Sequence, residues 1–128
     1  MVLPLLGGAK KLKILIAGAS GGIGKFLAEQ FSEKGFEVFG TFNTHPPKKK
    51  LTYKMDKVDV TNECEVKEWI NNIAEPSDEL CFIYCVGLNY NCITYKAETD
   101  KWIEVINTNL IGAQLALKYI LPLMRNKR

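Results

Sequence analysis

Hydrophobic positions along this chain follow two patterns that alternate from one end to the other. Short apolar runs predict strands at residues 14–17, 36–41 and 80–86, with a further strand inside the mixed segment 51–60. Apolar residues spaced three and four apart predict helices over residues 22–34, 62–76 and 99–124. Such alternation predicts an α/β fold, a doubly wound (Rossmann) parallel sheet of strand order 3-2-1-4 that stops before a fifth strand.

Local signals define several of these elements further. Gly35 stands where a helix C-terminus favours glycine, and Asn62 with Glu65 three residues later forms a capping-box pattern. The run 80–86 is nearly continuous, which is typical of a parallel strand buried on both faces. The last helix carries one apolar stripe, which we expect to pack on the sheet and to leave surplus apolar surface. The stripe comprises Ile103, Ile106, Leu110, Ala113, Leu117, Ile120 and Met124.

Length and charge indicate one domain and give no sign of a nucleic-acid or membrane partner. The 128 residues are 47% hydrophobic and 24% charged, as in ordinary globular chains. The net charge is only +3, with basic residues gathered in segments 10–13, 48–50 and 125–128. The apolar stretch near the start is too short to span a membrane. We therefore interpret residues 1–12 as a leader, 13–124 as the domain and 125–128 as a basic tail.

Cysteine and histidine usage argues against a metal site. The cysteines (Cys64, Cys81, Cys85 and Cys92) include no Cys-x-x-Cys pair, and the one histidine, His45, falls in a loop. Free cysteines in apolar runs behave as small buried hydrophobes. A reduced, cytoplasmic chain without bound metal is the simplest interpretation.

A glycine-rich turn between the first strand and the first helix is the strongest functional motif. Its glycines follow the spacing Gly-x-x-x-Gly-x-Gly, at Gly18, Gly22 and Gly24. A strand, a glycine turn and a helix in this order are typical of a phosphate-binding loop, because the helix N-terminus offers N–H groups and a partial positive charge. The alternative is a glycine-rich turn that holds no ligand. We therefore expect a dinucleotide to bind the loop. The candidate ligands are Gly18, Ser20, Gly21, Gly22, Ile23 and Gly24.

The end of the second predicted strand bears on the choice of cofactor. Sites specific for NAD usually carry an acid there, which holds the ribose hydroxyls. Residues 38–43 contain no acid, so a 2′-phosphate meets no repulsion. Thr41 and Asn43 are candidate ligands of the ribose or phosphate, and the lysines at 48–50 either reach the phosphate or only solvate the loop. The sequence thus favours NADP, with NAD as the alternative.

These motifs resemble the short-chain dehydrogenase/reductase family. The loop is similar to its Thr-Gly-Ala-Ser-Gly-Gly-Ile-Gly, with Ala17 in place of threonine. The segment from Trp102 through Asn109-Leu110-Ile-Gly112 is similar to the family's Trp-x-x-x-x-x-x-Asn-Leu-x-Gly. The resemblance extends from Lys13 to Met124. It implies the same doubly wound fold and hydride transfer between a nicotinamide cofactor and a carbonyl or alcohol.

The resemblance also implies roles for particular residues. Asp59 would meet the adenine amino group and the backbone of Val60 the adenine ring. Gly87 would keep the backbone close to the cofactor ribose, and Asn109 would help to hold the water network of the catalytic lysine. On chemistry alone, Asp59 could instead face solvent before a helix, and Asn109 could be purely structural.

The chain departs from the family pattern in two places. The segment 84–87 reads Tyr-Cys-Val-Gly, where the family has Asn-Asn-Ala-Gly, so two asparagines that stabilise the sheet are missing. The family's catalytic serine and its Tyr-x-x-x-Lys motif fall beyond residue 128. The Tyr-x-x-x-Lys string at 53–57 lies in a strand-like segment, where residues four apart cannot act as one pair, and we interpret it as coincidence.

We therefore expect the cofactor-binding portion of an NADP-preferring short-chain oxidoreductase, inactive as the isolated chain. A 3-oxoacyl reductase is one guess at the activity of a completed protein. The alternatives are a non-catalytic nucleotide-binding or interaction module and one half of a split enzyme. Because strand 80–86 would form an apolar sheet edge, we expect a partner, either a second copy or a complementary C-terminal half.

Overall fold

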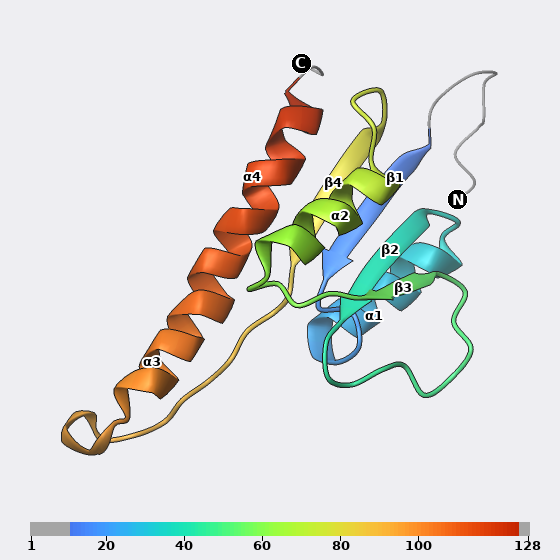
Figure 1. The fold of residues 1–128 in the computed structure, drawn as a ribbon. Coiled ribbons are helices and arrows are strands. Elements are labelled where there is room, and N and C mark those ends of the chain that lie inside the picture. The colour runs from blue at the N-terminus through green and yellow to red at the C-terminus, as the bar shows by residue number, and fades with distance from the viewer. Residues whose placement is uncertain (1–10, 126–128) are drawn as a thin grey trace.

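Four parallel strands form the central sheet (Figure 1). The computed structural model describes residues 11–125, so residues 1–10 of the expected leader and 126–128 of the expected basic tail lie outside the described residues. The order β3-β2-β1-β4 with all pairings parallel confirms the predicted doubly wound topology. The strands are β1 (Leu12–Ala17), β2 (Glu37–Phe42), β3 (Lys54–Lys57) and β4 (Glu79–Tyr84).

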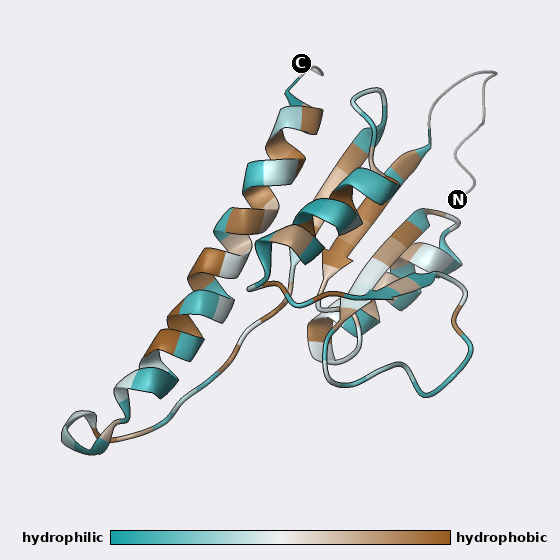
Figure 2. Ribbon diagram, in the orientation of Figure 1, coloured by the Kyte–Doolittle hydropathy of each residue, from teal (hydrophilic) through white to brown (hydrophobic). Residues whose placement is uncertain are grey.

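Helices cover both faces of this sheet (Figure 1). Side chains alternate between faces along a strand, so Ile14 and Ile16 pack in the cluster beside α1 (Gly22–Glu33). Leu15, between them, packs in a second cluster with residues of α2 (Glu63–Ile73) and α4 (Gly112–Met124). All three β1 side chains are at most 1% exposed, which makes β1 the centre of the core. Figure 2 shows its hydrophobic colouring.

The predicted caps are present. Asn62 accepts backbone N–H bonds from Cys64 and Glu65 at 3.1 and 3.3 Å, which confirms the expected start of α2. Gly35 has a φ of +85°, and its N–H donates to the Ser32 carbonyl just after α1. Glycine adopts this left-handed backbone without steric cost, so it ends the helix as predicted.

The sequence predicted one continuous helix at the C-terminus. The structure instead has three helical segments joined end to end. They are α3 (Thr99–Ile106), a π-helical turn η2 (Asn107–Ile111) and α4, and a short 3-10 helix η1 (Thr94–Lys96) precedes them. In Figure 1 these segments form one rod, and α3 extends beyond the sheet. Pro122 lies within the last turn of α4 and does not end it.

The prediction that the seven-residue apolar stripe packs on the sheet was wrong for most of its members. Ile103, Ile106, Leu110 and Leu117 are 43–63% exposed, and only Ile120 of the stripe is buried. Ile103 and Ile106 belong to α3, which extends beyond the sheet and buries none of its residues. The residues that are buried are Thr108, Gly112, Leu115, Ala116 and Ile120. The expected surplus of exposed apolar surface is confirmed.

Strand β4 is half-buried, so the prediction of a strand buried on both faces was also wrong. In the described part of the chain, β4 pairs only with β1 and therefore forms an edge of the sheet. Leu80 and Phe82 pack against the cluster that includes α4 residues, but the side chains from Leu80 to Tyr84 keep partial exposure because no second strand within residues 11–125 pairs with β4. No helix within residues 11–125 is long and apolar enough to cross a membrane.

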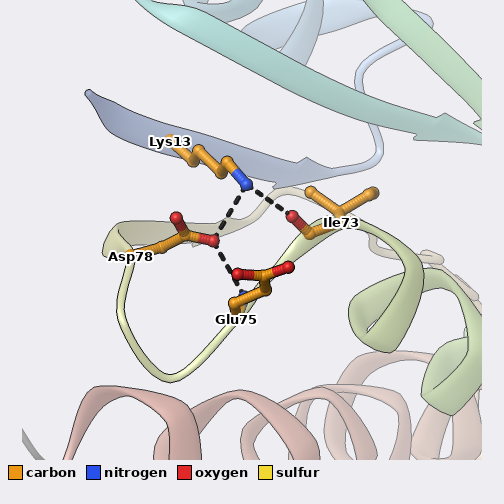
Figure 3. A network of polar contacts seen from close by, with 4 residues as sticks. All are labelled: Lys13, Ile73, Glu75 and Asp78. Atoms are coloured by element: carbon orange, nitrogen blue, oxygen red, sulfur yellow. Dashed lines mark hydrogen bonds and ion pairs between the residues drawn. The ribbon is translucent and has the colours of Figure 1, made fainter. Parts of the chain in front are cut away.

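A polar network fastens the loop before β4 to β1 (Figure 3). The Lys13 ammonium donates to the Asp78 carboxylate at 2.8 Å and to the Ile73 carbonyl at 2.9 Å. The same Asp78 oxygen accepts the Glu75 N–H at 2.8 Å. The Lys13 and Asp78 side chains are only 21% and 13% exposed, so solvent screens this ion pair less than a surface pair.

We expect Lys13→Met to lower the free energy of unfolding by about 2 kcal/mol, because a charged donor is lost from two acceptors. The matched control is Lys25→Met, which removes a pair that is about half exposed and 4.0 Å long. That change should cost less than about 0.5 kcal/mol. Urea unfolding of both variants measures the difference, and equal losses would contradict the assigned role of the network.

Candidate functional site

A cavity of about 750 Å³ opens at the carboxyl ends of the strands. Its walls come from the segments that follow β1, β2, β3 and β4 and from one face of α3 and η2. In a doubly wound sheet the crossover direction changes between β1 and β4, and ligands bind in the crevice outside these strand ends. The topology therefore places this cavity at the usual ligand position of the fold.

The glycine loop forms one wall of the cavity, and two of its positions leave no room for a side chain. Gly18 has a φ of +81°, and a Cβ there would lie 2.9 Å from the Val86 side chain. At Gly24 a Cβ would lie 1.8 Å from the Gly18 carbonyl oxygen. The first turn of α1 therefore packs directly on the end of β1, which requires glycine at position 24 as the spacing predicted.

The middle of the loop is open instead. Gly21 and Gly22 have no heavy atom within 4 Å of an ideal Cβ, and Gly22 has a φ of +55°. Gly21 is the N-cap of α1 and offers no side chain to the N–H groups of the first turn, which also contains no acid. These N–H groups carry the positive end of the helix dipole, so the loop suits a phosphate group.

Thr41 supports the loop from β2. Its Oγ1 accepts the Gly18 N–H at 3.0 Å, and its carbonyl accepts the Ala19 N–H at 2.8 Å. The side chain is 1% exposed, although the residue lines the cavity. Thr41 thus ties the start of the glycine loop to the neighbouring strand.

Asp59 and Val60 line the cavity after β3. Asp59 Oδ1 accepts bonds from the backbone and the hydroxyl of Thr61 at 2.9 and 2.7 Å, while its own N–H donates to the Glu65 carboxylate at 2.7 Å. These bonds fix the orientation of the Asp59 carboxylate at the entrance to α2. The geometry is compatible with the role that the resemblance implies for this residue.

Asn109 holds the segment after β4 through its side-chain amide. Its Oδ1 accepts the Leu88 N–H at 2.7 Å and its Nδ2 donates to the Leu88 carbonyl at 2.9 Å. Gly87 lines the cavity next to this pair, whereas Asn109 itself lies outside the lining and is exposed. The amide therefore fixes the backbone of the cavity wall.

Two titratable side chains near the end of β4 are perturbed by burial. Desolvation raises the pKa of Tyr84 to about 12, and it also raises the pKa of the Cys85 thiol. Both groups therefore stay protonated at neutral pH, so Cys85 lacks the thiolate character of a reactive cysteine although it lines the cavity. Among residues 11–125, no cluster of three or more His, Cys, Asp or Glu side chains could hold a metal ion.

The structure brings most of the predicted site residues together. Those that line the cavity are Gly18, Ser20, Gly21, Thr41, Asn43, Asp59, Val60 and Gly87. Gly22, Ile23, Gly24 and Asn109 lie outside the lining, where Gly24 and Asn109 act on its shape and Ile23 is 73% exposed. The lysines at 48–50 are exposed and do not line the cavity.

Sequence reasoning missed several lining residues. Thr44 and His45 follow β2 and line the cavity beside Asn43. Thr44 Oγ1 and His45 Nδ1 lie 2.9 Å apart. Asp100 and Glu104 line the cavity from α3. Positions 100, 104 and 108 are four residues apart, and this spacing could have indicated that they share one helix face. The others are Phe42, Val58, Thr61, Cys85, Val86, Leu88, Ile103 and Asn107.

A parallel sheet of order 3-2-1-4 with an open glycine loop at its switch point defines a Rossmann-type dinucleotide-binding domain. Comparison with known proteins identifies a family within this class. The sequence profile described as short chain dehydrogenase matches residues 12–128, which is nearly the whole chain. The chain belongs to this family, whose members bind NAD or NADP.

Particular relatives agree with this assignment. The chain is 33% identical to a 3-ketodihydrosphingosine reductase of Bacteroides thetaiotaomicron, over 90% of this chain and 43% of the relative. It is 26% identical to the 3-oxoacyl-[acyl-carrier-protein] reductase FabG of Salmonella typhimurium, over 89% of this chain and 50% of the relative. The chain thus spans about half the length of the curated relatives it matches.

A solved structure shows the same arrangement. The aldohexose dehydrogenase of Thermoplasma acidophilum, in ligand-free form, superposes with a TM-score of 0.81 at 27% identity. The match covers 93% of this chain and 46% of that one. The four strands and their helices therefore correspond to about half of a short-chain dehydrogenase.

Proposed function

We propose that these residues form the NADP(H)-binding portion of a short-chain oxidoreductase, which transfers hydride between the nicotinamide and a carbonyl or alcohol substrate. The observation that carries the proposal is the cavity itself, where the glycine loop, Asp59 and Gly87 meet. The bound nicotinamide supplies or accepts the hydride, while this chain binds and orients the cofactor. The glycine loop would hold the pyrophosphate, and Asp59 with Val60 the adenine.

The residues after β2 support NADP over NAD. The segment 42–45 reads Phe-Asn-Thr-His, lines the cavity and contains no carboxylate. An acid at this position would hold the ribose hydroxyls of NAD and repel a 2′-phosphate. Instead of a carboxylate, this segment offers hydrogen-bond donors from the Asn43 amide and from the pair of Thr44 and His45.

Titration of the purified chain with NADPH and NADH by calorimetry tests the proposal. We expect NADPH to bind at least about tenfold more tightly, a difference of roughly 1.4 kcal/mol. Tighter binding of NADH would overturn the NADP preference, and binding of neither nucleotide would overturn the proposed site.

We expect Asn43→Asp to weaken NADPH binding by about tenfold or more, because the new carboxylate would repel the 2′-phosphate, while NADH binding stays within about threefold. Asn71→Asp is the matched control, since it makes the same chemical change at an exposed position of α2 outside the cavity. A uniform loss of both cofactors in Asn43→Asp would argue against discrimination at this position.

We further propose that residues 1–128 alone do not catalyse hydride transfer. They contain no Tyr-x-x-x-Lys motif on a helix, and the string at 53–57 lies across β3. In the family a tyrosine of this motif is the proton donor, without which reduction of a carbonyl stalls. The expected result is NADPH binding without carbonyl-dependent oxidation of NADPH.

A second candidate, a chain that works with a partner, is favoured by the exposed apolar surface. Leu110 is 63% exposed and Trp102 49%, and β4 leaves a sheet edge open. The partner would be a second copy or a complementary C-terminal half, and a stable monomer by light scattering would count against both. Activity restored by mixing with a C-terminal half would identify a split enzyme, whereas continued inactivity would favour a nucleotide-binding module.

The substrate class and compartment follow as proposals from the relatives and the thiols. The two curated relatives described above are named as reductases of a 3-keto or 3-oxoacyl compound, which suggests a 3-oxo group as the reducible centre for the complete protein. The cysteines within residues 11–125 are free thiols, which supports a reducing, cytoplasmic location.

A further inference from the structure

Tyr84, the last residue of β4, makes a contact that links the sheet to the π turn η2. Its hydroxyl donates to the Thr108 carbonyl at 2.6 Å. A Cβ at Gly112 would lie 2.4 Å from this hydroxyl oxygen, so the hydroxyl occupies space that only glycine leaves open. Tyr84 stands where the family's strand-end motif has asparagine, and Gly112 ends the Asn-Leu-x-Gly motif.

The π turn explains why the Thr108 carbonyl needs such a donor. In a regular α-helix this carbonyl would accept the N–H of Gly112, four residues later. Here the Gly112 N–H donates instead to the Asn107 carbonyl, five residues back. The Tyr84 hydroxyl thus supplies the Thr108 carbonyl with a hydrogen bond in place of the Gly112 N–H. Thr108 is 8% exposed, so water gives limited compensation.

The turn positions the side chain that fixes the cavity wall. Asn109 is the next residue after Thr108, and its amide makes the two bonds to the Leu88 backbone. Leu88, Asn107 and Thr108 all line the cavity. A change in the π turn would therefore rotate Asn109 and release the segment that follows Gly87.

We propose that Tyr84 is a positioning residue, whose hydroxyl holds the π turn in the register that lets Asn109 fix Gly87 and Leu88 for the nicotinamide half of the dinucleotide. The cofactor part of this inference rests on the proposed function. Because burial raises the pKa of Tyr84 to about 12, its hydroxyl remains a donor through the physiological pH range. Asn43 and Asp59, at the adenine end, have no bond to this assembly in the described contacts.

The test variant is Tyr84→Phe, studied in the whole chain. We expect NADPH affinity to fall about tenfold, whereas the affinity for 2′,5′-ADP, which has no nicotinamide, changes less than about twofold. Exchange of the Leu88 amide hydrogen, followed by NMR without ligand, should accelerate at least about tenfold, while the Leu15 amide in β1 is unaffected. The matched control is Tyr119→Phe, which removes a bonded hydroxyl that joins α4 to Glu63 outside the cavity.

A second pair of variants keeps the test decisive if Tyr84→Phe folds poorly. Gly112→Ala displaces the Tyr84 hydroxyl and should reproduce the loss of NADPH affinity and the faster Leu88 exchange. In the double variant Tyr84→Phe/Gly112→Ala, the alanine should lower NADPH affinity less than it does in the otherwise unaltered chain, because the Tyr84 hydroxyl oxygen that it would meet is gone. Asn109→Ala should likewise combine non-additively with Tyr84→Phe.

The outcomes separate this inference from the proposed function. Lower stability of Tyr84→Phe with unchanged Leu88 exchange would make Tyr84 merely structural and overturn the inference. Equal losses for NADPH and 2′,5′-ADP would overturn the assignment to the nicotinamide half. If the unaltered chain binds neither nucleotide, the proposed function fails, and the Leu88 exchange of the variants still decides whether Tyr84 positions Asn109.

Discussion

Replacing Gly24 with alanine is expected to abolish measurable dinucleotide binding and to lower the free energy of unfolding by roughly 3 kcal/mol. The added Cβ would lie 1.8 Å from the Gly18 carbonyl oxygen and 3.2 Å from the Cys85 Cβ. Backbone atoms held at the end of a central strand cannot move aside like the end of a flexible side chain. The first turn of α1 must therefore shift away from β1, and its N–H groups leave the phosphate position with it.

Gly21→Ala is the control within the same loop. Position 21 has an extended backbone, with a φ of −161°, and no heavy atom lies within 4 Å of its ideal Cβ. The free energy of unfolding should therefore stay within about 0.5 kcal/mol of the original value. Urea unfolding of both variants and NADPH titration of Gly24→Ala provide the measurement. A Gly24→Ala protein that keeps its stability would contradict the close packing of helix on strand.

Truncating Ile120 to alanine should be the most damaging apolar change in α4, with a loss of about 3 kcal/mol. Ile120 is fully buried in the cluster that contains Leu15, Phe39 and Ile70. Its removal would leave a cavity between α4 and the sheet that rigid neighbours cannot fill. The effect tests whether this face of α4 packs on the sheet, as the burial of Leu115, Ala116 and Ile120 indicates.

The neighbouring residue provides the comparison. Leu121 is 47% exposed, so Leu121→Ala should cost less than about 1 kcal/mol. Thermal or urea unfolding of the two variants is sufficient, provided that both show a single transition. Similar losses would mean that a partner or another copy covers Leu121 under the conditions used, or that the helix is rotated from the position described.

Most of the architecture could be predicted because its signals are local. The glycine spacing at Gly18, Gly22 and Gly24 needs only a strand before it and a helix after it, and Asn62 determines the start of α2 through its own side chain. The strand order followed from the handedness of the crossovers. What failed was the long C-terminal helix, since periodicity assumes a constant repeat and the π turn at Asn107–Ile111 breaks it.

The site was predictable to the extent that motifs name its residues. Asn43, Asp59 and Gly87 were found because each follows a strand that belongs to a recognisable pattern. Asp100 and Glu104 were not, because they reach the cavity only through the direction in which α3 leaves the sheet. Likewise, nothing in the order of residues places the Tyr84 hydroxyl against Thr108, a contact made across 24 positions.

The central position of β1 has a consequence for how the chain folds. One side of β1 pairs in parallel with β2, where Lys13 meets Glu37, and the short connection between them consists of the glycine loop and α1. The other side pairs Leu12 with Glu79, so its formation must close a loop of about half the chain. Contacts so distant in sequence slow the search for the native state. During synthesis, that edge of β1 therefore stays unpaired until β4 has left the ribosome.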